Sequence, residues 1–300
     1  MKKKTYLFAL MAMALTLGSC SDNENGIGGE TSKYITVSTS IGNMTRVATD
    51  ANGGQTFEEG DEISVYAWTG DATVAPETRE RVVNNAINKL TNGSWVSTPQ
   101  MLWKNNRDKH YFIGVYPISA ISDLSAGEYT FDVNKQTESD LLVAVNKDGL
   151  SYNVDEQQTV PLTFTHVMAK LAVNLTYKNQ WGGIPTVEKV VVGNAAKEAT
   201  INYLTKVVTP STTAKEDFSL PEITENTKYV SVIIPQEDVK QLTIVIGGKN
   251  FVYDNGTPFK LESGKITTVN LEVGRDEIKL GDVKITNWED GSTFSGVALN

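Results

Sequence analysis

Cys20 is the single cysteine of this 300-residue chain and the side chain best suited to covalent chemistry. One cysteine cannot form a disulfide within the chain, and a thiolate nucleophile needs a base beside it. The two histidines, His110 and His166, lie far from Cys20 in the sequence. A catalytic pair would therefore depend on a tertiary contact that the sequence does not indicate, and the role of Cys20 has to be inferred from its neighbours.

The residues before Cys20 have the organisation of an export signal. Residues 2–4 are lysines, and residues 6–17 form an apolar run that is too short to span ~30 Å of hydrocarbon as a helix. The sequence LGSC at 17–20 resembles the lipobox of a bacterial lipoprotein. That resemblance implies cleavage before Cys20, acylation of its thiol and anchoring by lipid, since several acyl chains hold a soluble domain at a bilayer.

We therefore expect a lipoprotein signal peptide at 1–19 and a flexible tether at 20–33, which is polar and Gly-rich. The alternative is an ordinary secretory signal in which Cys20 is incidental. Removing residues 1–19 takes away three lysines, so the formal charge moves from -9 to -12. This acidic balance argues against a nucleic-acid partner.

Beyond the tether the pattern is that of short strands with alternating polarity, which predicts an all-β fold of antiparallel sandwiches. A weaker helical pattern follows Pro76, over 76–90, and the polar segment 147–158 is the expected seam between two domains. Eight residues are expected in the cores: Val65, Phe112, Leu142, Phe164, Leu171, Val191, Ile233 and Ile244. The expected strands are 34–41, 62–68, 110–117, 128–133, 140–145, 170–177, 187–194, 227–235, 242–248, 266–273 and 282–288.

Few residues form a pattern typical of catalysis or of cofactor binding. The sequence has no Cys/His cluster, Gly-rich phosphate loop or EF-hand loop, so we expect no metal, no cofactor and no enzyme activity. His166 lies in a strand-like segment and is expected to be structural. The acidic pairs at 58–59 and 61–62 are interpreted as a solvated turn. Five tryptophans could be sugar platforms, although core packing is the commoner role: Trp68, Trp95, Trp103, Trp181 and Trp288.

Several segments together resemble the fimbrillin family, the Bacteroidetes type V pilus subunits. They are FEEGDEISVYAW at 57–68, SDLLVA at 139–144, VPLTFTHVMAKLAVNL at 160–175, FKLESGKITTVNLEV at 259–273 and VKITNWEDG at 283–291. The resemblance covers nearly the whole mature chain and keeps these landmarks in order. It implies two tandem transthyretin-like β-sandwich domains, which we expect at 34–155 and 156–300.

The resemblance also implies a function and a location. Family members are exported as lipoproteins, trimmed by an Arg-directed protease and assembled by strand exchange. We therefore expect a structural or adhesive subunit of a fimbria at the cell outer membrane, anchored through lipid on Cys20 before processing, with other fimbrial subunits as partners. The alternative is a non-polymerising surface lipoprotein that binds a glycan or a host protein.

Two segments would take part in that assembly. Arg46 is the only basic residue of the polar loop 41–54, so Arg46-Val47 is the expected processing bond; the alternative is an ordinary solvated arginine. Cleavage there would release the strand 34–41, whose Ile35, Val37 and Ile41 are expected to face the core of the first sandwich. By resemblance, the replacement strand comes from the C-terminal segment 282–300, in which Val283, Ile285, Val297 and Leu299 alternate with polar or small residues.

Overall fold

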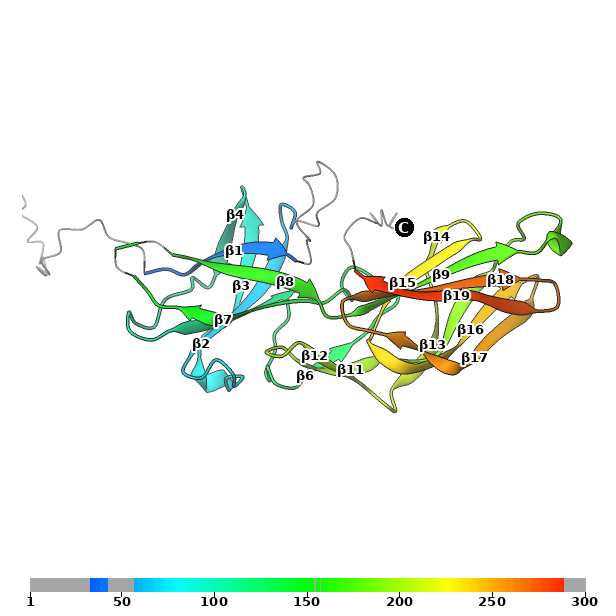
Figure 1. Ribbon diagram of the computed structural model, residues 1–300. Coiled ribbons are helices and arrows are strands. Elements are labelled where there is room, and N and C mark those ends of the chain that lie inside the picture. The colour runs from blue at the N-terminus through cyan, green and yellow to red at the C-terminus, as the bar shows by residue number, and fades with distance from the viewer. Residues whose placement is uncertain (1–32, 43–56, 154, 157, 289–300) are drawn as a thin grey trace, which may run out of the picture.

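The computed structural model describes residues 33–42, 57–153, 155–156 and 158–288. Within these ranges the chain forms strands connected by turns, with two single-turn 3-10 helices at Thr78–Glu80 and Asn179–Trp181. The all-β prediction is therefore confirmed. Strands gather in two lobes that follow one another along an elongated molecule (Figure 1).

The first lobe is one seven-stranded sheet with the strand order β1-β8-β7-β5-β2-β3-β4. Its pairs are antiparallel except β1 with β8, which run parallel. The strands are β1 (Thr36–Ile41), β2 (Glu62–Thr69), β3 (Arg81–Thr91), β4 (Ser94–Thr98), β5 (His110–Tyr116), β7 (Leu142–Leu150) and β8 (Thr159–His166).

Three further sheets make up the rest of the molecule. The five-stranded sheet is ordered β14-β15-β9-β18-β19, the four-stranded sheet β13-β10-β16-β17, and the three-stranded sheet β12-β11-β6. Their strands are β6 (Gly127–Thr130), β9 (Ala169–Tyr177), β10 (Lys189–Ala196), β11 (Glu198–Asn202), β12 (Val207–Pro210), β13 (Lys215–Ser219), β14 (Glu222–Thr224), β15 (Lys228–Ile233), β16 (Gln236–Ile246), β17 (Lys249–Leu261), β18 (Lys265–Val273) and β19 (Ile278–Asn287).

The chain leaves the first sheet for the last time between β8 and β9, within two residues of His166. This change of sheet comes after the seam expected at 147–158, because β8 pairs with both β1 and β7 and so belongs with the first lobe. The connection is short, and β6 from the earlier part of the chain pairs with β11 of the later part. The two lobes are therefore joined by more than one segment.

Two apolar cores lie on opposite faces of the first sheet. One core contains Ile35, Val65, Phe112 and Phe164, inside the curl of the sheet. The other continues from Tyr66 and neighbouring residues on the opposite face into the second lobe. Strand β2 is buried on both faces, which agrees with its run of four apolar residues from Val65 to Trp68.

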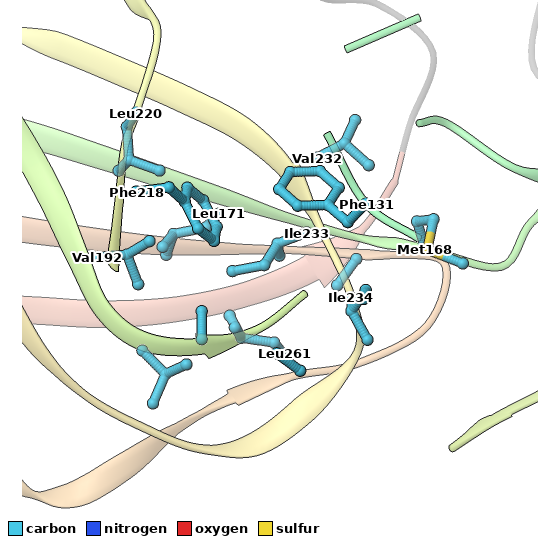
Figure 2. Packing of buried hydrophobic residues seen from close by; sticks show 14 of the residues in the cluster. Phe131, Met168, Leu171, Val192, Phe218, Leu220, Val232, Ile233, Ile234 and Leu261 are labelled. Carbon is cyan, nitrogen blue, oxygen red and sulfur yellow. The ribbon is translucent and has the colours of Figure 1, made fainter. Parts of the chain in front are cut away.

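The core of the second lobe lies between its sheets. Phe131, Leu171, Val192, Phe218 and Ile233 come together there from different strands and from the segment after β6 (Figure 2). Seven of the eight predicted core residues are buried, and the exception is Val191, which is only partly buried. Because side chains alternate along β10, its neighbours Val190 and Val192 face the core instead.

The helix predicted over 76–90 is wrong. Residues 81–91 form β3, which pairs with β2 on one side and β4 on the other. The register between β2 and β3 shifts beside Asn85, whose φ of 57° is left-handed. This β-bulge adds one residue to the strand, so Val83 and Ala86 share a face three positions apart. The bulge thus gives the apolar residues of β3 a spacing similar to that of the buried face of a helix.

Candidate functional site

Strand β1 lies at the end of the seven-stranded sheet, and the residues just before it make further backbone contacts on its other side. On one edge it pairs in parallel with β8, from Thr36 opposite Thr159 to Ile41 opposite Phe164. On the other side, the backbone N–H of Ile35, the residue before β1, donates to the carbonyl of Met101 at 3.0 Å. The first sheet therefore curls until its first strand meets the segment after β4. Regular pairing begins at Thr36, two residues after the predicted start, because Tyr34 makes only an isolated bridge with Leu102.

The inward face of β1, together with Ile35 directly before it, presents three aliphatic side chains and one hydroxyl. Ile35 and Val37 are 1% and 6% exposed, and Ile41 is partly buried against the same core. Between them, the Oγ1 atom of Thr39 accepts a hydrogen bond from the indole Nε1–H of Trp95, at 3.0 Å. These four positions define the contacts that any strand in this place has to make.

The tryptophan that contacts Thr39 is fixed by aromatic packing. The ring of Phe57 packs edge-on against Trp95 at 5.3 Å and against Phe164 at 5.1 Å. Trp95 comes from β4, which follows the tight turn at Asn92-Gly93, where both residues have positive φ. Trp95 is a residue of this site that the sequence pattern alone does not identify. The Asn-Gly turn before an alternating segment was the available signal that Trp95 lies in a hairpin strand.

The outward face of β1 pairs hydroxyl groups with β8. Thr36 Oγ1 lies 3.3 Å from Thr159 Oγ1, and the hydroxyl of Ser40 donates to Thr163 Oγ1 at 3.2 Å. Both contacts are exposed to solvent, so their contribution to stability is small. They extend the match between β1 and β8 beyond the backbone ladder.

The carboxylates at 58–62 brace the first lobe. Glu59 accepts a hydrogen bond from the backbone N–H of Asn92 at 2.7 Å, and Glu62 forms a 3.0 Å ion pair with Lys89. Tyr116 donates its hydroxyl to Asp61 at 3.3 Å. Burial, together with the Asp61 charge, raises the pKa of Tyr116 to about 12. Each of these groups supports the β3–β4 hairpin or its surroundings, and none converges with another on a cavity.

The last described strand, β19, pairs with β18 at the edge of the five-stranded sheet. Val283 lies opposite Val269 and Ile285 opposite Thr267, and both side chains are more than one-third exposed. Val283 and Ile285 are therefore already paired within their own sheet. Val37 and Ile41 belong to the first sheet and Ile35 directly precedes its strand β1, so the two sets of predicted residues lie on different sheets.

Trp288 follows β19 and packs where the two lobes meet. Its indole stacks on the imidazole of His166 with ring centroids 4.0 Å apart, and the ammonium of Lys170 lies 3.9 Å from its centroid. The Nδ1 atom of His166 lies 2.8 Å from Asp140 Oδ1. Trp288, His166 and Lys170 are all buried, which is the environment expected of a structural histidine.

Other predicted site residues lie outside the described residues. These are Cys20 at the lipobox, Arg46 and Val47 at the expected processing bond, and Val297 and Leu299 in the expected donor segment. The chain enters the segment that contains Arg46 directly after β1, where the N–H of Gly42 donates to the carbonyl of Phe164 at 2.8 Å.

The five tryptophans are buried or partly buried, a position that suits packing and not a sugar platform. Within the described ranges, no three His, Cys, Asp or Glu side chains are placed to hold a metal ion. The same part of the chain contains no helix long and apolar enough to cross a bilayer.

Comparison with known proteins gives one consistent family. A candidate fimbrium subunit of Bacteroides uniformis, Fim1C, is 24% identical over 315 residues, with 97% of each chain covered. Candidate cell adhesion proteins from Bacteroides uniformis and Bacteroides ovatus have solved structures with TM-scores of 0.63 and 0.62, at 19% and 18% identity. These alignments cover 86% and 87% of this chain and 100% and 99% of the solved chains. A family model described as fimbrillin-like matches residues 45–288, and the chain therefore belongs to the fimbrillin-like family.

Proposed function

We propose that this chain is a structural or adhesive subunit of a cell-surface fimbria. It is exported as a lipoprotein through Cys20, cut at Arg46-Val47 and assembled by exchange of β1 for a strand of a neighbouring subunit. The observation that carries this proposal is the position of β1. It is the first strand of the described part of the chain, and the segment that contains Arg46 separates it from β2.

Removal of β1 would expose a groove that cannot remain empty. Ile35 and Val37 contribute about 3–6 kcal/mol of transfer free energy when both are fully buried, as an upper estimate. The backbone of β8 would also lose its partners from Thr159 to Phe164. Unpaired strand edges of this kind recruit another strand, and strand addition is an established mode of pilus assembly.

The donor would come from residues beyond β19. Val283 and Ile285 already pair with β18, so donating them would dismantle an edge of the five-stranded sheet. Residues 293–300 carry the second alternating pair, Val297 and Leu299. We therefore assign donation to this terminal segment, and β19 remains in its own sheet.

The proposal is tested by cleaving purified precursor with an arginine-specific protease. We expect cleavage at Arg46, followed by multimers in size-exclusion chromatography, and deletion of residues 293–300 should suppress the multimers. Arg46→Gln is the matched control and should stay monomeric. Cleaved protein that retains the 34–46 peptide and stays monomeric at high concentration would show that this chain does not polymerise in this way.

Lipidation is tested in cells by mass spectrometry of the mature amino terminus, which reports the state of Cys20 and Arg46 together. Cys20→Ala should abolish labelling by a palmitate analogue while the circular dichroism spectrum of the purified domain stays unchanged. Unchanged labelling of the variant would exclude Cys20 as the attachment point.

A further inference from the structure

The groove that β1 would leave consists of four side-chain sites with different chemistry. They are called the first to the fourth site, in the order of the residues that fill them. The first site holds Ile35 and the second holds Val37, and both are buried and apolar. The third holds Thr39, which accepts the hydrogen bond of Trp95. The fourth holds Ile41, which is only partly buried at the end of the strand. An occupant therefore needs two aliphatic residues at one end, followed by a hydrogen-bond acceptor.

The third site selects against an aliphatic residue. The indole of Trp95 is fixed by Phe57 and directed at the Thr39 oxygen, so its N–H has a defined place for an acceptor. An aliphatic side chain at that place would leave the partly buried N–H without this partner. A donor left without its acceptor costs more free energy than replacing donor and acceptor together by apolar groups.

The terminal segment has the same spacing as the groove. In TFSGVALN at 293–300, alternate residues are Thr293, Ser295, Val297 and Leu299, which span seven positions, as the four groove sites do. The other alternate set includes Gly296 and ends in an amide, so it would leave the apolar sites poorly filled.

Two orientations of this segment give opposite matches. Parallel to β8, as β1 runs, Thr293 and Ser295 would fill the two apolar sites and Val297 would face Trp95. Antiparallel to β8, Leu299 and Val297 fill the apolar sites and Ser295 faces Trp95. A backbone ladder with β8 forms in either direction, so the side chains decide.

We infer that residues 293–299 of a second copy of this chain enter the groove antiparallel to β8, with the Ser295 hydroxyl accepting the hydrogen bond of Trp95. Leu299 then takes the first site, Val297 the second and Thr293 the partly buried fourth. Trp95 is the specificity-determining residue of the groove. This inference rests on the proposed function and adds the register and direction of the exchanged strand.

The test measures binding of labelled peptides that span residues 290–300 to precursor cleaved after Arg46, by fluorescence anisotropy. Ser295→Val should weaken binding about fivefold, the effect of one net hydrogen bond. Ser295→Thr should bind within about twofold of the native peptide, because it keeps the hydroxyl. In the parallel orientation Ser295 would face an apolar site, so tighter binding of the valine peptide would overturn the inference.

The matched control is a cleaved precursor that carries Trp95→Phe. It should bind the native and Ser295→Val peptides equally, since no indole N–H requires an acceptor; equal discrimination by both proteins would also overturn the inference. If the Trp95→Phe protein fails to fold, a Val297→Thr peptide is measured against cleaved precursor that keeps Trp95. The antiparallel orientation predicts that this peptide binds more weakly than the native peptide, because Val297 then fills an apolar site. Peptide binding without discrimination refutes the register alone, whereas complete absence of binding refutes the exchange itself.

Discussion

At the scale of single residues, His110 shows how a buried titratable group is kept neutral. The backbone N–H of Lys104 donates to its Nε2 at 3.0 Å, and its Nδ1 lies 3.1 Å from the carbonyl oxygen of Asp108. The first contact requires an unprotonated Nε2, so Nδ1 carries the proton. Burial is the main cause that lowers the pKa of His110 below its ordinary value of 6.5.

This environment predicts a loss of stability in mild acid. The unfolded chain takes up the His110 proton first, so this contribution to stability is present above about pH 6.5 and is lost as the pH falls toward the lowered pKa. Between about pH 7.5 and pH 5, the free energy of unfolding should fall more for the native chain than for His110→Phe. Urea titrations at each pH measure it, and parallel pH profiles would contradict the prediction.

Gly114 on β5 illustrates a steric constraint in the first core. A Cβ atom at this position would lie 2.7 Å from Cζ of Phe164 and 3.2 Å from Cδ1 of Leu162. Both neighbours are buried, so neither ring nor methyl group can move away cheaply. Gly114→Ala should lower the free energy of unfolding by about 1–3 kcal/mol. Chemical denaturation measures this, and a variant as stable as the native chain would refute it.

At the scale of elements, the contribution of the β3 bulge to stability can be measured by substituting one residue, Asn85. Asn85 is left-handed, and its Oδ1 accepts a hydrogen bond from the Tyr66 hydroxyl at 3.2 Å. Asn85→Val should destabilise the fold by about 1–3 kcal/mol because a β-branched residue is strained at positive φ. Asn85→Gly should cost less, since glycine adopts this conformation readily. Thermal unfolding of both variants checks the order, and a more stable valine variant would contradict it.

At the scale of the whole molecule, Trp288 connects the end of β19 to both lobes. It stacks on His166 from β8 and contacts Lys170 from β9. Trp288→Ala should lower the free energy of unfolding by about 3–5 kcal/mol. Trp288→Phe should lose less, because it keeps a ring above the imidazole. Denaturant titration distinguishes the two variants, and equal losses would show that the aromatic stack contributes nothing.

The sequence by itself determined the all-β class and most core positions, because alternation of polar and apolar residues follows directly from the two-residue repeat of a strand. It also singled out Ile35 and Val37 as inward-facing residues, and both are buried. The alternation of residues in β10 wrongly predicted that Val191 faces the core, and the apolar spacing in β3 wrongly predicted a helix. A one-residue shift or a bulge changes which residues share a face without changing composition.

Only the tertiary structure decided which distant residues meet. The Trp95–Thr39 hydrogen bond joins residues 56 positions apart, and it exists because the sheet curls until β1 approaches β4. The stack of Trp288 on His166 likewise requires β19 to end where β8 passes into β9. Pairing of this kind depends on the order and curvature of strands, which are set by many long-range contacts together, so no local pattern around Trp95 or Trp288 could specify its partner.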